Sequence, residues 1–131
     1  MRIRGHVLTG LLLLGATAAR AQDAPKDPPK PLSLAELEAA AVRDSNDASA
    51  HYQLAMGYWG KKRWDDAERS LRTAVQLSPG YSEAHLALAL VPERRGDKYW
   101  RKQVKEKGEA AVRAVFVESE FHYRRAFLLN P

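Results

Sequence analysis

The sequence predicts an all-α fold of antiparallel helix-turn-helix repeats arranged as a short right-handed solenoid. The main observation is an echo at a spacing of thirty-four residues, the period of several helical repeat arrays. Four residues carry this echo, and they recur in the same order: Ala50, His51, Leu54 and Ala55, then Ala84, His85, Leu88 and Ala89. A second observation is that apolar residues on either side of the echo follow the three- and four-residue spacing of one helix face. At 131 residues the chain has room for one small domain.

The first twenty-one residues have the composition of a cleaved signal peptide. Arg2 and Arg4 precede an apolar run over 7–19, and Ala19-Arg20-Ala21 has the small-x-small form of a cleavage site. An uncleaved anchor is the alternative, but the run is shorter than the roughly 18 residues that a spanning helix needs. We therefore expect an exported protein, periplasmic or secreted, whose mature chain begins near Gln22.

The composition and the missing motifs exclude several classes of protein. There is no cysteine, so neither a disulfide framework nor a lipid-modified cysteine is possible. Removing residues 1–21 leaves 18 basic and 16 acidic residues, which lowers the formal net charge from +5 to +2. No nucleophile elbow, phosphate-binding glycine loop, HExxH helix or paired-carboxylate motif is visible. The sequence therefore predicts neither an enzyme nor a bound cofactor.

The first predicted helix follows a proline-rich linker over 22–32, which favours an extended spacer. Ser33 and Glu36 have the spacing of a capping box, and the apolar pattern behind them reaches about Arg43. Leu37 and Ala40 lie thirty-four residues before Leu71 and Ala74. We therefore interpret residues 33–46 as the second half of an incomplete repeat.

Residues 48–81 form one intact predicted repeat. Asp47 or Ser49 can cap its first helix, which is expected to end near Gly60. Its second helix is expected to begin near Trp64 and to stop before Pro79-Gly80. Helices of this length joined by short turns are typical of an antiparallel hairpin.

This unit resembles the tetratricopeptide repeat family, and the resemblance rests on seven residues in register. Small residues in the pattern allow two helices to approach closely, and large ones fill the space between neighbouring pairs. His51 stands where the family usually has tryptophan. The seven repeat-packing residues are Leu54, Ala55, Tyr58, Ala67, Leu71, Ala74 and Pro79.

A second repeat over 82–131 departs from the pattern at Pro92, where the family has tyrosine. Proline inside a helix costs about 3 kcal/mol, so we expect this helix to end or kink near Val91. The pattern resumes when about eighteen residues are skipped, which predicts an insertion at about 96–112. The residues that resume it are Glu120, Arg124, Ala126, Leu129 and Pro131, matching Glu68, Arg72, Ala74, Leu77 and Pro79.

The resemblance implies an adaptor or scaffold that holds a peptide or protein partner in an apolar concave groove. Five residues occupy the groove positions of the family pattern: Tyr52, Met56, Trp59, Leu86 and Leu90. The alternative is that this stripe belongs to the core and is covered by the inserted segment or by the helix after Ser33.

The insertion carries a cluster of basic residues next to Tyr99 and Trp100: Arg94, Arg95, Lys98, Arg101, Lys102, Lys105 and Lys107. Such a cluster suits anionic lipid, a cell-wall polymer or an acidic protein. Predicted export argues against nucleic acid as its ligand. The alternative is a solvated charged face, with Trp100, Val104 and Ala111 sharing the opposite face of one helix.

The final predicted helix leaves apolar residues without an expected cover. Phe121, Phe127 and Leu128 suggest that a partner, another subunit or a further repeat packs against it. A structural module that self-associates through this helix is therefore an alternative function. His51 and His85 occupy equivalent positions, which explains them as packing residues, and the sequence predicts no metal site.

Overall fold

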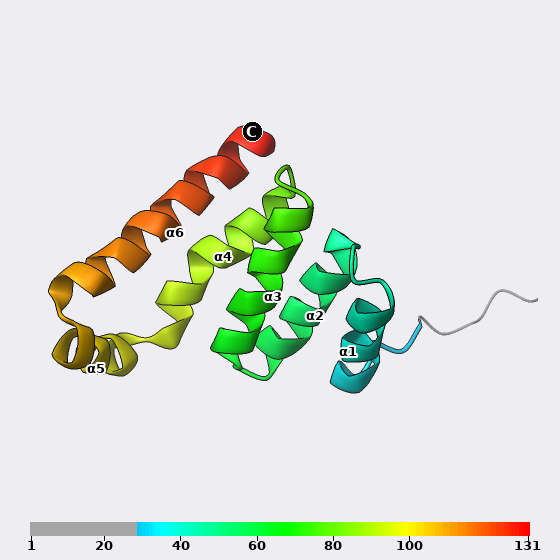
Figure 1. Cartoon of the computed structure of the whole chain (residues 1–131), viewed down its shortest axis with the longest axis horizontal. Helices are drawn as coiled ribbons and strands as arrows, with labels where there is room; N and C mark the ends of the chain where they lie inside the picture. Colours follow the sequence, from blue (N-terminus) through cyan, green and yellow to red (C-terminus); the bar gives the residue numbers. More distant parts are fainter. Residues whose placement is uncertain (1–28) are drawn as a thin grey trace, which may run out of the picture. The chain divides into compact units, whose positions relative to one another are not determined.

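Residues 29–131 are the described part of the computed structural model, and within them the chain forms six helices and no strand (Figure 1). The predicted signal peptide and most of the linker lie outside these residues. The all-α helical repeat fold is confirmed. Among residues 29–131, no helix is both long and apolar enough to cross a membrane. The helices are α1 (Leu34–Arg43), α2 (Ala48–Gly60), α3 (Trp64–Leu77), α4 (Ser82–Arg95), α5 (Asp97–Lys107) and α6 (Glu109–Leu129).

Helix α1 begins with the predicted capping box. The Ser33 side chain accepts from the Glu36 amide, and the Glu36 carboxylate accepts from the Ser33 amide at 2.7 Å. Helix α1 packs on α2 at Gly57, where an added Cβ would lie 2.7 Å from Leu37 Cδ1. An alanine at this position would require the Leu37 side chain to move. The helix is also tied to α2 by the Tyr58 hydroxyl, which donates to Glu38 at 2.8 Å.

Helices α2 and α3 form the intact hairpin. Asp47 caps α2 by accepting from the Ser49 amide at 2.8 Å. Three alanines of the hairpin have no exposed surface, Ala55, Ala67 and Ala74, which lets the helices approach closely. Ala55 and Ala74 form a core with Leu71, and α4 closes this core from the other side.

Helix α4 contradicts one half of the expectation that this helix would end or kink near Val91. It does not end near Val91 but continues through the buried Pro92 to Arg95. The last turn is held from outside the helix. Trp100 Nε1 donates to the Pro92 carbonyl at 2.7 Å, and the Arg95 guanidinium donates to two carboxylates of α3. These contacts offset the hydrogen bond that proline removes.

The predicted insertion is helical. It comprises α5 and the first turn of α6, which are separated by Gly108 at a φ of 84°. The expected single face of Trp100, Val104 and Ala111 is therefore wrong, because this left-handed glycine ends α5 before Ala111. Trp100 and Val104 remain together on α5.

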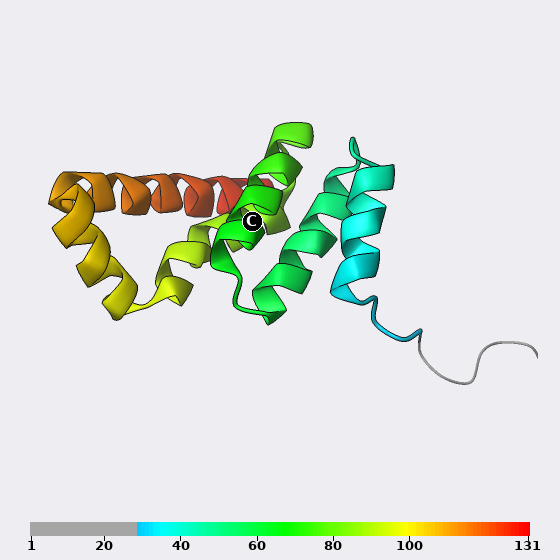
Figure 2. The same ribbon diagram turned by 60° about the horizontal axis from the view of Figure 1, so that its bottom comes forward.

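Helix α6 lies along α4 and completes the second hairpin, with α5 at one end joining the two (Figures 1 and 2). Ser119 Oγ donates to the Ala89 carbonyl at 2.6 Å, and Ala126 is buried. The second repeat is thus α4 and the latter part of α6, split by one extra helix.

Candidate partner-binding groove

The first helix of each repeat makes the same kind of hydrogen bond through its histidine. His51 Nε2 lies 2.9 Å from the Ser45 carbonyl, and His85 Nε2 lies 3.0 Å from the Pro79 carbonyl. In each repeat the carbonyl belongs to the residue six positions earlier. The structure therefore shows the equivalence that the sequence echo predicts, with each ring anchoring its helix to the preceding turn.

The second helices also keep their register once α5 is skipped. Arg72 donates to Glu68 at 2.8 Å, and Arg124 donates to Glu120 at 2.5 Å, each one helical turn apart. Ala74 and its equivalent Ala126 are both buried. A shift of fifty-two residues thus relates α3 to α6.

Residues at equivalent positions of α3 and α6 differ in how deeply they are buried. Leu71 is 0% exposed, whereas its equivalent Tyr123 is 57% exposed. Val75 is partly buried against the core, whereas its equivalent Phe127 is 66% exposed. The difference arises because α4 covers α3, while no helix among residues 29–131 covers the same side of α6.

The uncovered side of α6 forms an apolar depression with α4 of about 230 Å³. We call it the α4–α6 groove, and its lining residues are Ser82, Glu83, Leu86, Tyr123, Ala126, Phe127 and Asn130. Leu86 is one of the five groove residues predicted from the sequence. Sequence reasoning missed Tyr123 and Ala126 as lining residues, although shifting Leu71 and Ala74 by fifty-two residues points to them.

Of the other four predicted groove residues, three lie on α2 and Leu90 lies on α4. Tyr52, Met56 and Trp59 are partly buried and pack on the core that α4 completes. The Tyr52 ring lies 5.1 Å from that of Tyr81, and burial raises the pKa of Tyr52. Leu90 is partly buried as well. The aromatic stripe of α2 is therefore partly buried against this core.

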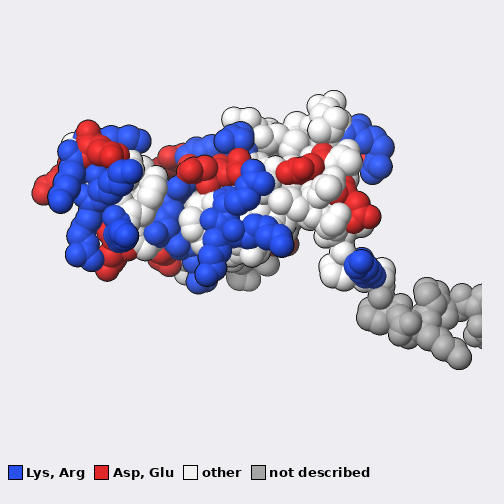
Figure 3. Space-filling view, turned by 90° about the horizontal axis from the view of Figure 1, so that it is seen from below, with Lys and Arg blue, Asp and Glu red and all other residues white. Residues whose placement is uncertain are grey.

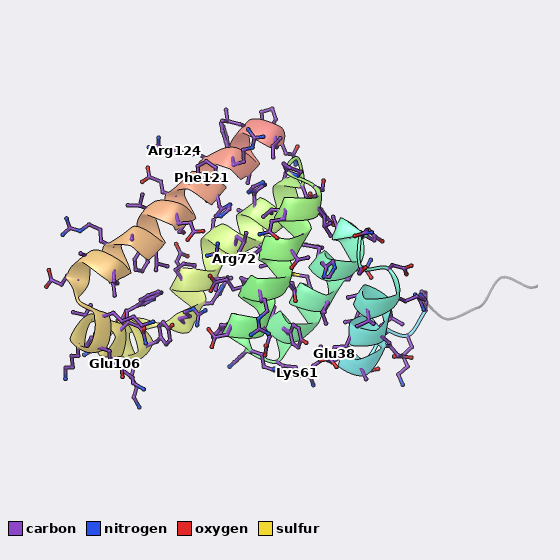
Figure 4. The ribbon with its side chains drawn as sticks, viewed as in Figure 1. Glu38, Lys61, Arg72, Glu106, Phe121 and Arg124 are labelled. Atoms are coloured by element: carbon purple, nitrogen blue, oxygen red, sulfur yellow. The ribbon has the colours of Figure 1, made fainter. Side chains whose placement is uncertain are left out.

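A polar network joins α3 to α4 and α6 beside this core. The Arg95 side chain is 7% exposed and donates to Asp65 and Glu68 at 2.7 Å each. Arg72 donates to Glu118 of α6 at 2.5 Å, and this hydrogen bond lowers the pKa of Glu118. Figure 4 shows Arg72 on α3, with Arg124 and Phe121 on α6. The network positions α6 against the intact repeat.

A pair of buried histidines joins α4 to α6. His85 Nδ1 and His122 Nδ1 lie 2.9 Å apart, so one proton sits between them. Because the Pro79 carbonyl accepts only from an N–H, His85 Nε2 carries a proton and His85 Nδ1 accepts from His122. Burial, and then His85, lower the pKa of His122. In the described part of the chain, no three metal-ligating side chains come together.

The structure divides the predicted basic cluster. Arg95 belongs to the polar network, and the Arg94 guanidinium lies over the Trp59 ring at 5.9 Å. The other five cations are on α5, at the left of Figure 3. Four of them line one depression of about 500 Å³: Lys98, Arg101, Lys102 and Lys105.

Comparison with known proteins identifies the intact hairpin. Residues 48–81 match the family described as tetratricopeptide repeat. This span coincides with α2, α3 and the turn that leads to α4. Comparisons with curated proteins and with solved structures found no match.

Proposed function

Because residues 48–81 match the tetratricopeptide repeat family, and such repeats generally serve protein interaction, we propose that the protein is an adaptor that holds a protein partner in the α4–α6 groove. Repeats of this family are typically not enzymes, so the proposal assigns no catalytic step. Fold alone does not establish the role, and the groove supplies the specific argument.

The observation that supports the proposal is the apolar surface that remains exposed at the groove. Tyr123 and Phe127 are more than half exposed, and Leu86 lies opposite them across the depression. A continuous exposed apolar patch with a polar rim is typical of an interaction site. Glu83 and Asn130 provide polar groups at that rim.

The proposed surface keeps part of the groove expected from the sequence. Leu86 lines it directly, and Leu90 lies one helical turn further along α4. Tyr52, Met56 and Trp59 are assigned a packing role against the core of the intact repeat.

A displayed random peptide library, panned against the protein, tests the proposal. We expect enriched peptides that bind the wild type and lose at least about tenfold in affinity to Tyr123→Asp, since a charge in the groove would be left unpaired. Val42→Asp, on the exposed side of α1, is the matched control and should retain binding. Enriched peptides that ignore Tyr123→Asp would contradict the groove assignment.

A second candidate function is supported by the cations of α5. Lys98, Arg101, Lys102 and Lys105 lie on one helix face, where like charges repel. Among the described residues, Lys102 has an acidic partner, Glu106, at 3.6 Å. We propose that this face binds an anionic lipid surface.

Sedimentation with vesicles of phosphatidylglycerol and phosphatidylcholine tests the second candidate. Binding should weaken as salt shortens the screening length from about 10 Å at 0.1 M to about 3 Å at 1 M. Lys98→Glu with Lys105→Glu should abolish it, while Lys61→Glu with Lys62→Glu, in the turn after α2, should not. Binding that ignores salt or the α5 variants would contradict this candidate.

We also propose that the protein acts outside the cytoplasm, because residues 1–21 have the composition of a signal peptide. Mass spectrometry of the mature N-terminus provides the test. A terminus near Gln22 is expected, and retention of residues 1–21 would contradict the proposal.

A further inference from the structure

We infer that the occupant of the α4–α6 groove is an amphipathic α-helix of a partner protein, lying against α4 and α6 as α4 lies against α2 and α3. This inference rests on the proposed function, because it names the partner for the same groove. It depends on two observations. The two repeats have equivalent residues at matching positions, and α4 covers α3 whereas no helix among residues 29–131 covers the same side of α6.

Within the chain, α4 shows what kind of segment fills such a groove. Its covering face consists of residues spaced as one stripe of a helix, Ala84, Ala87, Leu88 and Val91. This stripe packs against Leu71 and Ala74 of α3 and Ala55 of α2. Its small residues let α4 approach α3 closely.

The α4–α6 groove repeats that arrangement with equivalent residues. Four lining residues occupy positions equivalent to residues of the intact repeat: Leu86 to Tyr52, Tyr123 to Leu71, Ala126 to Ala74, and Phe127 to Val75. Each of these counterparts belongs to the core closed by α4 or packs against it. Tyr123 and Phe127 are larger than Leu71 and Val75, so the incoming stripe needs small residues at its first turns. An alanine-rich stripe meets this requirement.

Charge adds a second requirement for the partner. At the intact repeat, Glu68 accepts from Arg95, eleven residues after Ala84, as well as from Arg72. The equivalent Glu120 is exposed and accepts from Arg124, the counterpart of Arg72. We therefore expect the partner helix to supply the counterpart of Arg95. This would be a basic residue eleven positions after the first small residue of its apolar stripe.

The same template sets the direction of the partner helix. Tyr81, just before α4, lies against Tyr52 near the start of α2. The partner helix therefore begins beside Leu86 and runs parallel to α4. Glu83 then lies near its N-terminus, where the helix dipole favours a negative charge.

A peptide that copies α4 tests the inference directly. The probe is a fluorescein-labelled copy of residues 81–95 with Pro92→Ala, which removes the helix breaker, and with Leu86→Glu and Leu90→Lys, which form an outward ion pair. We expect saturable binding to the protein by fluorescence anisotropy. Tyr123→Asp should weaken it at least about tenfold, and Val42→Asp should leave it unchanged.

A charge exchange tests the register of the bound helix. Glu120→Arg should weaken binding about threefold to tenfold, and changing the peptide position that copies Arg95 to glutamate should restore it. Circular dichroism of each variant checks that the fold is intact. Peptide binding that is absent, or that ignores both Tyr123→Asp and the charge exchange, would overturn the inference.

Two results separate this inference from the proposed function. If library peptides depend on Tyr123 but NMR shows them extended in the complex, the helical partner is wrong and the adaptor proposal stands. If no library peptide depends on Tyr123, the groove assignment itself fails. Sedimentation showing self-association that Tyr123→Asp abolishes would instead make a second copy of this chain the occupant.

Discussion

The covered side of α3 and the uncovered side of α6 are two versions of one surface. On α3, Leu71 and Ala74 are fully buried under α4, and Arg72 reaches Glu118 of α6. On α6, the equivalent Tyr123 is largely exposed, and Arg124 reaches no further than Glu120 of its own helix. The comparison shows that register sets which residues face the groove, while the next helix determines their burial.

The largest expected difference between these surfaces concerns the core residue. Leu71→Ala should lower the free energy of unfolding by about 2–5 kcal/mol, because it leaves a cavity beneath α4. Tyr123→Ala, at the equivalent position, should cost less than about 1 kcal/mol because its ring is mostly in water. Urea denaturation measures both, and equal losses would contradict the assigned difference in cover.

The next largest difference is expected between Arg95, which binds α3, and Arg124 on the uncovered α6. Arg95→Ala should cost about 1.5–3 kcal/mol, because it removes charge-assisted hydrogen bonds from a nearly buried guanidinium. Arg124→Ala should cost less than about 0.5 kcal/mol, because its ion pair with Glu120 is exposed. The same denaturation experiment distinguishes them. A larger loss for Arg124→Ala would mean that α6 is covered.

The extra helix of the second repeat depends on a glycine that the intact repeat lacks. Gly108→Ala should cost about 1–2 kcal/mol, because alanine is strained at a φ of 84°. Gly60→Ala, at the end of α2, meets no atom within 4 Å and should be neutral or stabilise by up to about 1 kcal/mol. Thermal unfolding followed by circular dichroism measures both. Equal effects would contradict the claim that the turn between α5 and α6 needs glycine at position 108.

The smallest expected effect concerns pH. Since burial and His85 hold the pKa of His122 below its usual 6.5, the unfolded chain binds a proton more readily than the folded chain. Stability should therefore fall as the pH drops from about 7 through 6.5 toward the lowered folded value. His122→Gln should reduce this slope between about pH 7 and 5.5, and an unchanged slope would contradict the role of the pair.

The sequence was sufficient to predict the repeat and its register. The echo at His51 and His85 and the skip to Glu120 and Arg124 are local patterns, and the paired positions make equivalent contacts in the structure. The length of α4 was not predictable from Pro92 alone, because Trp100 and Arg95 hold its last turn through distant partners. The groove was only partly predictable, since burial depends on which helix covers which face.

The most direct test of the groove assignment is NMR of the isotope-labelled protein titrated with the α4-derived peptide. We expect the largest chemical-shift changes at Leu86, Tyr123, Ala126 and Phe127, with Tyr52, Met56 and Trp59 changing little. That result would place the partner helix in the α4–α6 groove. Changes centred on Tyr52, Met56 and Trp59, with Tyr123 and Phe127 unaffected, would contradict it.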